Sequence, residues 1–201
     1  MKFEKLKFKV EPYRQTLKTS CLSSAFLMIG HFYFPYKFSL NKTQEKKIHE
    51  KIKFNIGEEG ELRELESFSK LALFAIKKGF KIKYFLIFKK HKKPRGISLE
   101  NWKKLKDSFL LDLKKIKNNK SFKLIKRCTI RDIKKELKRG ALVICEKKYD
   151  HLITHAIVIR GYEGDIFYII DPLTGYQKYH SKDLKKEINL GYQKSFMSFI
   201  K

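Results

Sequence analysis

The first half of the chain is patterned mainly for helices. Apolar side chains in residues 61–78 recur every three or four positions, which is the spacing of one helical face. Gly79 follows where a helix-ending glycine is expected. Asn41, and Thr19 or Ser20, stand where side chains cap helix starts. These signals predict helices at 21–32, 42–53, 61–78 and 98–117, an extended arm at 2–10 and a strand at 80–88.

The second half of the chain changes to β-branched and aromatic runs of strand length. Residues 163–165 form a hairpin signal, and residues 171–175 form a second turn. The order of helices first and sheet second predicts an α+β fold with an antiparallel sheet, built as one domain over residues 1–201. The expected elements are a helix at 129–139 ending at Gly140, and strands at 141–145, 152–161, 166–170, 176–179 and 194–200.

The chain is strongly basic, with 47 Lys and Arg against 21 Asp and Glu and a formal net charge of +26. Such a charge favours anionic partners, including nucleic acid and acidic peptides. Lysine dominates over arginine and is spread over nearly every segment, whereas nucleic-acid binders usually gather their charge on one face. We therefore favour a compositional bias and keep nucleic-acid binding as an alternative.

The three cysteines, Cys21, Cys128 and Cys145, have neither disulfide-framework nor zinc-ligand spacing. An odd number of cysteines fits a reducing compartment. The N-terminus lacks the apolar stretch of a signal peptide, and the longest uncharged run, residues 19–36, is too short and polar for a membrane span. We expect a cytoplasmic protein without a membrane span, and no metal or organic cofactor is indicated.

Cys21 is a candidate nucleophile because it stands at the expected start of a helix. The positive end of a helix dipole favours the thiolate, which is the reactive form. The competing interpretation is an inert buried cysteine, since free cysteine is among the most buried residue types. Gln15 lies six residues earlier, where its amide could donate to an oxyanion together with the Cys21 backbone N–H.

His155 and Asp171 are candidates for the base and its orienting carboxylate. His155 lies within the expected strand 152–161, and Asp171 ends the next strand. A hairpin through Gly164 would bring both residues to the same end of the strand pair, where the carboxylate could fix the imidazole tautomer. His151 is the main competitor for the base role, and an Asp-Pro turn is the structural alternative for Asp171.

Three segments together resemble a known family. They are residues 13–28 (YRQTLKTSCLSSAFLM), 154–162 (THAIVIRGY) and 168–172 (YIIDP), and they resemble the papain-like peptidases of the bacteriocin-processing, double-glycine leader type. The resemblance covers the N-terminal motif and roughly residues 129–200. Residues 37–120 form a mostly helical segment atypical of the family, and Leu22 replaces the usual glycine or aspartate after the cysteine.

The resemblance implies a papain-like fold and assigns four roles. Cys21 would be the nucleophile, His155 the base, Asp171 the orienting acid and Gln15 the oxyanion donor. It implies a hydrolase or transferase that acts on the amide bonds of a peptide or protein substrate, acidic in view of the charge, through a thioester. The alternative is a nucleic-acid-binding or partner-binding protein built on an inactive version of this fold.

Overall fold

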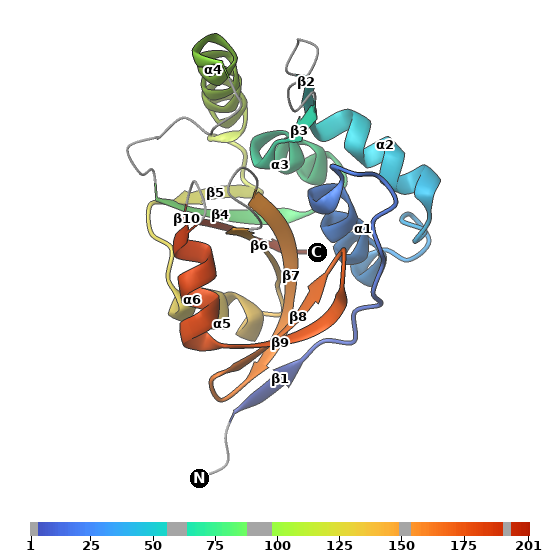
Figure 1. Ribbon diagram of the computed structural model, residues 1–201, viewed down its shortest axis with the longest axis vertical. Coiled ribbons are helices and arrows are strands. Elements are labelled where there is room, and N and C mark those ends of the chain that lie inside the picture. The colour runs from blue at the N-terminus through green and yellow to red at the C-terminus, as the bar shows by residue number, and fades with distance from the viewer. Residues whose placement is uncertain (1–3, 56–63, 88–97, 149–153, 191–193) are drawn as a thin grey trace.

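The computed structural model describes residues 4–55, 64–87, 98–148, 154–190 and 194–201 (Figure 1). Helices and strands are mixed along the chain rather than separated into two halves. The helices are α1 (Cys21–Tyr33), α2 (Lys42–Ile52), α3 (Phe68–Lys77), α4 (Leu99–Ile116), α5 (Ile130–Lys138) and α6 (Ser181–Leu190). The strands are β1 (Lys5–Lys7), β2 (Lys53–Asn55), β3 (Glu64–Glu66), β4 (Lys81–Ile87), β5 (Phe122–Ile125), β6 (Leu142–Lys148), β7 (Thr154–Glu163), β8 (Ile166–Asp171), β9 (Gly175–His180) and β10 (Lys194–Ile200).

The main sheet runs in the order β5-β4-β10-β6-β7-β8-β9, and β1 pairs with the end of β7. Among the described strands, every pair in this sheet is antiparallel apart from β4 and β5, which run parallel. β7 is the centre of the arrangement, because it contacts β6, β8, β1 and helix α1 (Figure 1). Side chains alternate across a strand, so each face of this sheet has its own core.

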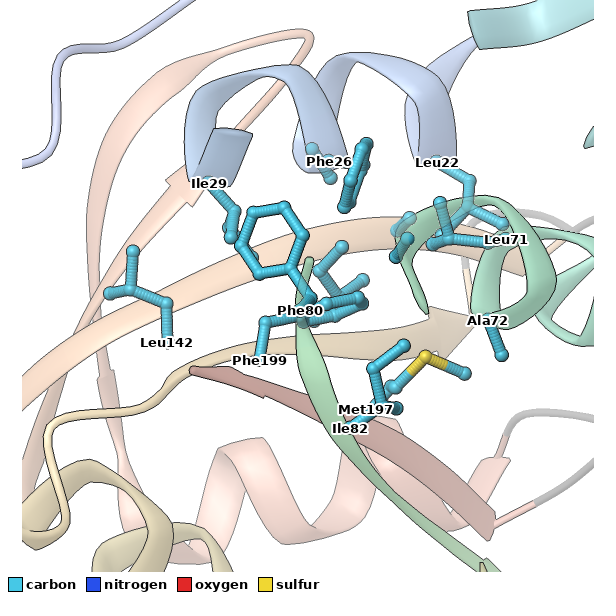
Figure 2. Close-up of a cluster of buried hydrophobic side chains, with 14 of the residues drawn as sticks. Leu22, Phe26, Ile29, Leu71, Ala72, Phe80, Ile82, Leu142, Met197 and Phe199 are labelled. Atoms are coloured by element: carbon cyan, nitrogen blue, oxygen red, sulfur yellow. The ribbon is translucent and has the colours of Figure 1, made fainter. Parts of the chain in front are cut away.

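The larger core lies between the sheet and helices α1, α2, α3 and α4. Phe26 of α1 is fully buried, and its ring centroid lies 5.4 Å from that of Phe80 and 5.6 Å from that of Phe199. Figure 2 shows these rings between α1 and the strands, with Ile29 and Met197 in the same cluster. Burial of this apolar face holds α1 against β7 and thereby fixes the position of the helix start.

The second core lies on the opposite face and is covered by α5 and α6. Ile133 and Leu137 of α5 and Leu184 of α6 are fully buried there against Ile157 and Ile159 of β7. Consecutive residues of β7 therefore face different cores. This division matters for the site, because α1 lies on one face of the sheet only.

The α+β prediction is confirmed, with corrections to its elements. The helix expected at 61–78 begins only at Phe68, capped by Ser67, and residues 64–66 form β3 instead. Leu65 fits a period of two as well as a helical period, and pairing with β2 decides between them. The sheet is antiparallel as predicted apart from the parallel β4–β5 pair, and the sequence patterns missed β2, β5 and α6.

Other expectations hold where the structure describes the chain. The 163–165 hairpin is present, with Gly164 at a positive φ of 55°, and Asn41 caps α2 by accepting from the Gln44 N–H. Cys128 and Cys145 are buried in the second core. His151 lies outside the described residues. None of the helices in the described ranges is both long and apolar enough to cross a bilayer.

Candidate active site

Cys21 is the first residue of α1 and is partly accessible to solvent. The backbone N–H of Ala156, the residue that follows His155 on β7, is close enough to the thiol to act on its pKa in the lowering direction. The packing of α1 on β7 thus brings the proposed nucleophile to the strand that carries the proposed base, although the two residues are far apart in the sequence.

The surroundings of Cys21 do not favour a free thiolate. Burial, and then the carboxylate of Glu66, raise the pKa of the thiol to about 12. The helix start alone predicted the opposite direction, and that expectation is corrected here. The positive end of the α1 dipole is offset by the negative charge of Glu66. This carboxylate accepts hydrogen bonds from the N–H groups of Leu22 at 2.7 Å and Ser23 at 3.2 Å. The resting thiol therefore holds its proton, and a base must remove it.

Glu66 is itself held in place by a histidine. Its side chain is only 3% exposed, and its Oε1 lies 2.9 Å from Nδ1 of His49 on α2. The carboxylate also accepts from the hydroxyl of Ser23. Glu66 thus performs the capping of α1 that the sequence assigned to Thr19 or Ser20, and Ser20 makes no capping hydrogen bond.

His155 and Asp171 lie together, as the hairpin predicted. Nε2 of His155 is 2.7 Å from Oδ1 of Asp171, and both side chains are buried. Asp171 also accepts from the backbone N–H of Leu173 at 2.9 Å. Burial opposes ionisation of Asp171, but the hydrogen bonds from His155, Lys147 and Leu173 outweigh it and hold its pKa well below the usual range. An ionised Asp171 requires Nε2 to donate, which leaves Nδ1 as the basic nitrogen.

Lys147 is a member of this cluster that the sequence patterns did not reveal. It lies directly opposite His155 in the β6–β7 register, and its Nζ is 2.7 Å from Oδ2 of Asp171. Burial opposes its charge, but the hydrogen bond to Asp171 outweighs burial and raises the pKa of Lys147. One carboxylate is therefore shared between an imidazole and an ammonium. The feature of the sequence that could have pointed to it is a lysine near the end of a strand that is otherwise mostly apolar.

Gln15 lies beside the site, but its amide is engaged locally. Its Nε2 donates to the carbonyls of Leu17 at 3.1 Å and Lys18 at 3.4 Å, and its Oε1 is buried without a partner. The backbone N–H of Gln15 donates to the carbonyl of Pro172 at 2.9 Å. The loop that carries Gln15 is thereby fixed to the turn that follows Asp171.

A second buried carboxylate fixes the loop that leads into α1. Glu45 of α2 is fully buried and accepts hydrogen bonds from the Tyr13 hydroxyl, the Thr16 N–H and the hydroxyls of Ser20 and Ser24. Burial opposes its ionisation, but these hydrogen bonds lower the pKa of Glu45. Glu45 therefore holds the Gln15 loop against the helix that begins with Cys21.

Metal chemistry was not indicated by the sequence. Within the described ranges, no group of three or more His, Cys, Asp and Glu side chains is arranged to hold a metal ion.

Comparison with solved structures identifies the fold. A C39-like peptidase from Bacillus anthracis matches over 98% of both chains, with 15% sequence identity and a TM-score of 0.52. The chain has the papain-like fold of the C39-like peptidases. A double-glycine motif protease from an AMS/PCAT transporter, solved in complex with the leader peptide, matches over 100% of this chain and 96% of its own, with 14% identity and a TM-score of 0.49. The sequence matches no protein-family model and no curated protein.

The papain-like fold accounts for the arrangement described above. A helix bearing a cysteine at its start packs on a sheet that bears a histidine and an aspartate. Because the sequence identity is low, the similarity to the C39-like peptidase establishes the fold alone. The roles of the individual side chains depend on their geometry in this protein.

Proposed function

We propose that this protein is a cysteine-dependent hydrolase or transferase that acts on an amide bond of a peptide or protein. Cys21 is the nucleophile, His155 the base, Asp171 the orienting carboxylate and Gln15 an oxyanion donor. The observation that carries the proposal is the 2.7 Å pair of His155 on β7 and Asp171 on β8, together with the packing on β7 of the helix that begins with Cys21.

The reaction begins with a protonated thiol. Nδ1 of His155 takes the proton while the sulfur of Cys21 attacks the carbonyl carbon, which forms the C–S bond. The oxyanion accepts hydrogen bonds from the Cys21 N–H and the Gln15 amide. The imidazolium then protonates the leaving amine as the C–N bond breaks. Water or a second amine, deprotonated by His155, attacks the thioester and regenerates the thiol.

The role of Gln15 requires a local rearrangement. Its amide must turn from the carbonyls of Leu17 and Lys18 toward the substrate oxygen. The Oε1 atom of Gln15 has no hydrogen-bond partner in the present position of the amide. The rearrangement therefore breaks only the hydrogen bonds of Nε2 and costs less free energy than moving an amide that is bonded at both atoms.

Labelling of the intact protein with a limiting thiol electrophile at neutral pH tests the proposal. We expect a single label at Cys21, identified by mass, and slow labelling of the buried Cys128 and Cys145. The rate should fall by about 10²-fold or more in His155→Ala, because the base that removes the thiol proton is lost. Cys21→Ala should take no rapid label and should stay folded.

Equal labelling of all three cysteines, or an unchanged rate in His155→Ala, would reject the triad. A second candidate function would then stand: a partner-binding protein on an inactive papain-like fold. The raised pKa of Cys21 is the observation that favours it.

A further inference from the structure

An open groove of about 590 Å³ lies beside strands β1, β7, β8 and β9, apart from the proposed triad. Its lining includes four cationic side chains and no carboxylate among the described residues. The cations are Lys7, Lys9, Arg160 and Lys178, and two aromatic rings, Tyr168 and Tyr176, lie between them.

Arg160 is the central feature of this groove. It occupies a β-bulge, since the β7–β8 register shifts between Ile159 and Gly161, and bulges re-aim a side chain. The residue is only 9% exposed. One guanidinium nitrogen donates to the carbonyl of Phe8 at 2.9 Å, but Nε is buried without a partner. Among the described residues, Arg160 forms no ion pair with a carboxylate. Buried charges are normally paired, so this guanidinium is suited to an anionic ligand.

The two tyrosine rings of the groove make cation–π contacts with its cationic side chains. The Arg160 guanidinium lies 4.6 Å from the Tyr176 ring centroid, and Lys7 Nζ lies 4.7 Å from the Tyr168 centroid. Lys178 Nζ lies 5.9 Å from the same Tyr168 ring. These ring faces therefore contact cations rather than standing free to stack on bases, which favours a carboxylate-bearing ligand over single-stranded nucleic acid.

The close approach of β1 to β7 completes the groove. A Cβ on Gly161 would lie 2.1 Å from the carbonyl oxygen of Leu6, so only glycine lets the two strands meet. This contact carries Lys7 and Lys9 to the same side as Arg160. The groove also lies on the α1 face of the sheet, because Tyr176 pairs with Ile170, which belongs to the core beneath α1.

We propose that this groove binds an acidic stretch of a polypeptide, with side-chain carboxylates meeting Arg160, Lys7 and Lys178. The proposal rests on the proposed function in one respect: the acidic stretch would belong to the substrate whose amide bond reaches Cys21. Its position on the α1 face allows one extended chain to contact both regions.

Binding to the full-length Cys21→Ala protein tests the groove separately from catalysis. The probe is a fluorescently labelled hexaglutamate peptide, followed by anisotropy, with hexaglutamine as the uncharged comparison. We expect hexaglutamate alone to bind. Replacing the exposed Lys7 and Lys178 together by alanine should weaken binding about fivefold, from two exposed charge contacts.

The matched control removes two exposed lysines, Lys46 and Lys47, from α2. Binding should be unchanged in that protein. Arg160→Met should abolish binding, and its thermal midpoint shows whether the fold survives the loss of the hydrogen bond to the Phe8 carbonyl. If Arg160→Met does not fold, the comparison of the Lys7 and Lys178 double variant with the Lys46 and Lys47 double variant still tests the proposal.

Equal weakening by both lysine pairs, no hexaglutamate binding, or tighter binding of a single-stranded oligothymidylate of equal charge would overturn the proposal. Hexaglutamate binding together with Cys21 labelling that is unchanged in His155→Ala would support the groove and reject the proposed catalytic function.

Discussion

Lys147 Nζ lies 2.7 Å from one carboxylate oxygen of Asp171, while His155 Nε2 lies 2.7 Å from the other. The ammonium and the imidazole thus compete for the same negative charge. A positive charge so close to the carboxylate favours its ionised form, and the hydrogen bond from Lys147 helps to hold the pKa of Asp171 low. Lys147 therefore keeps the carboxylate that contacts His155 charged.

Removal of this ammonium should change the pH dependence of the site. Lys147→Met removes one of the hydrogen bonds that hold the pKa of Asp171 low, so the stability of the folded protein should fall less steeply below about pH 4 than in wild type. Lys147→Arg retains the charge and should leave the dependence unchanged. The measurement is urea unfolding as a function of pH, and coincident curves for Lys147→Met and wild type would contradict the role of Lys147.

Replacing the carboxylate at the start of α1 should make the thiol more reactive and the protein less stable. Glu66→Gln removes a charge that raises the pKa of Cys21, so labelling at neutral pH should become up to about tenfold faster. The loss of charged hydrogen bonds to Leu22 and Ser23 should lower the free energy of unfolding by about 1–3 kcal/mol.

Glu45→Gln is the control for Glu66→Gln. It also removes a buried carboxylate that holds the α1 region, but Glu45 is not among the groups that raise the pKa of Cys21. It should be destabilised without faster labelling. Equal acceleration in both variants would show that local loosening, rather than charge, controls the thiol.

Asp171 should make stability depend on acid pH. Its pKa is low in the folded protein and about 4 in the unfolded chain, so the unfolded chain binds the proton first as the pH falls. The stabilisation is complete above about pH 4 and is lost progressively below it. Urea unfolding should show a steeper loss below pH ~4 in wild type than in Asp171→Asn.

Asp171→Asn should also be less stable at neutral pH, by about 3–5 kcal/mol, because it leaves Lys147 without its buried partner. Parallel curves for the two proteins across the acid range would contradict the assigned pKa direction.

Gly161→Ala should separate β1 from β7. The new Cβ would meet the Leu6 carbonyl at 2.1 Å, and backbone must move to relieve this contact. We expect the free energy of unfolding to fall by about 1–3 kcal/mol. The N-terminal segment should also become more sensitive to limited proteolysis. Unchanged stability and proteolysis would show that β1 accommodates a methyl group.

Local patterns were sufficient for several parts of this protein. The start of α1 at Cys21 and the hairpin at Gly164 depend on apolar spacing and turn residues within a short window. The same hairpin fixed the relation of His155 to Asp171, because the turn sets the strand register.

Contacts between distant segments were not visible in those patterns. Residues 64–66 could extend a helix or form a strand, and pairing with β2 decided. β5 depended on a parallel partner, β4, that precedes it by a whole helix. Such pairings carry no local signature, since they are selected by the packing of the complete chain.

The sequence by itself determined the α+β class, the position of Cys21 at a helix start and the neighbouring positions of His155 and Asp171. Only the tertiary structure decided the electrostatics of the site. Glu66 reaches the start of α1 from β3, and Lys147 reaches Asp171 from β6, so both charges arrive from segments distant in sequence. A pKa depends on burial and on charges within a few ångströms, and those distances exist only once the chain is folded.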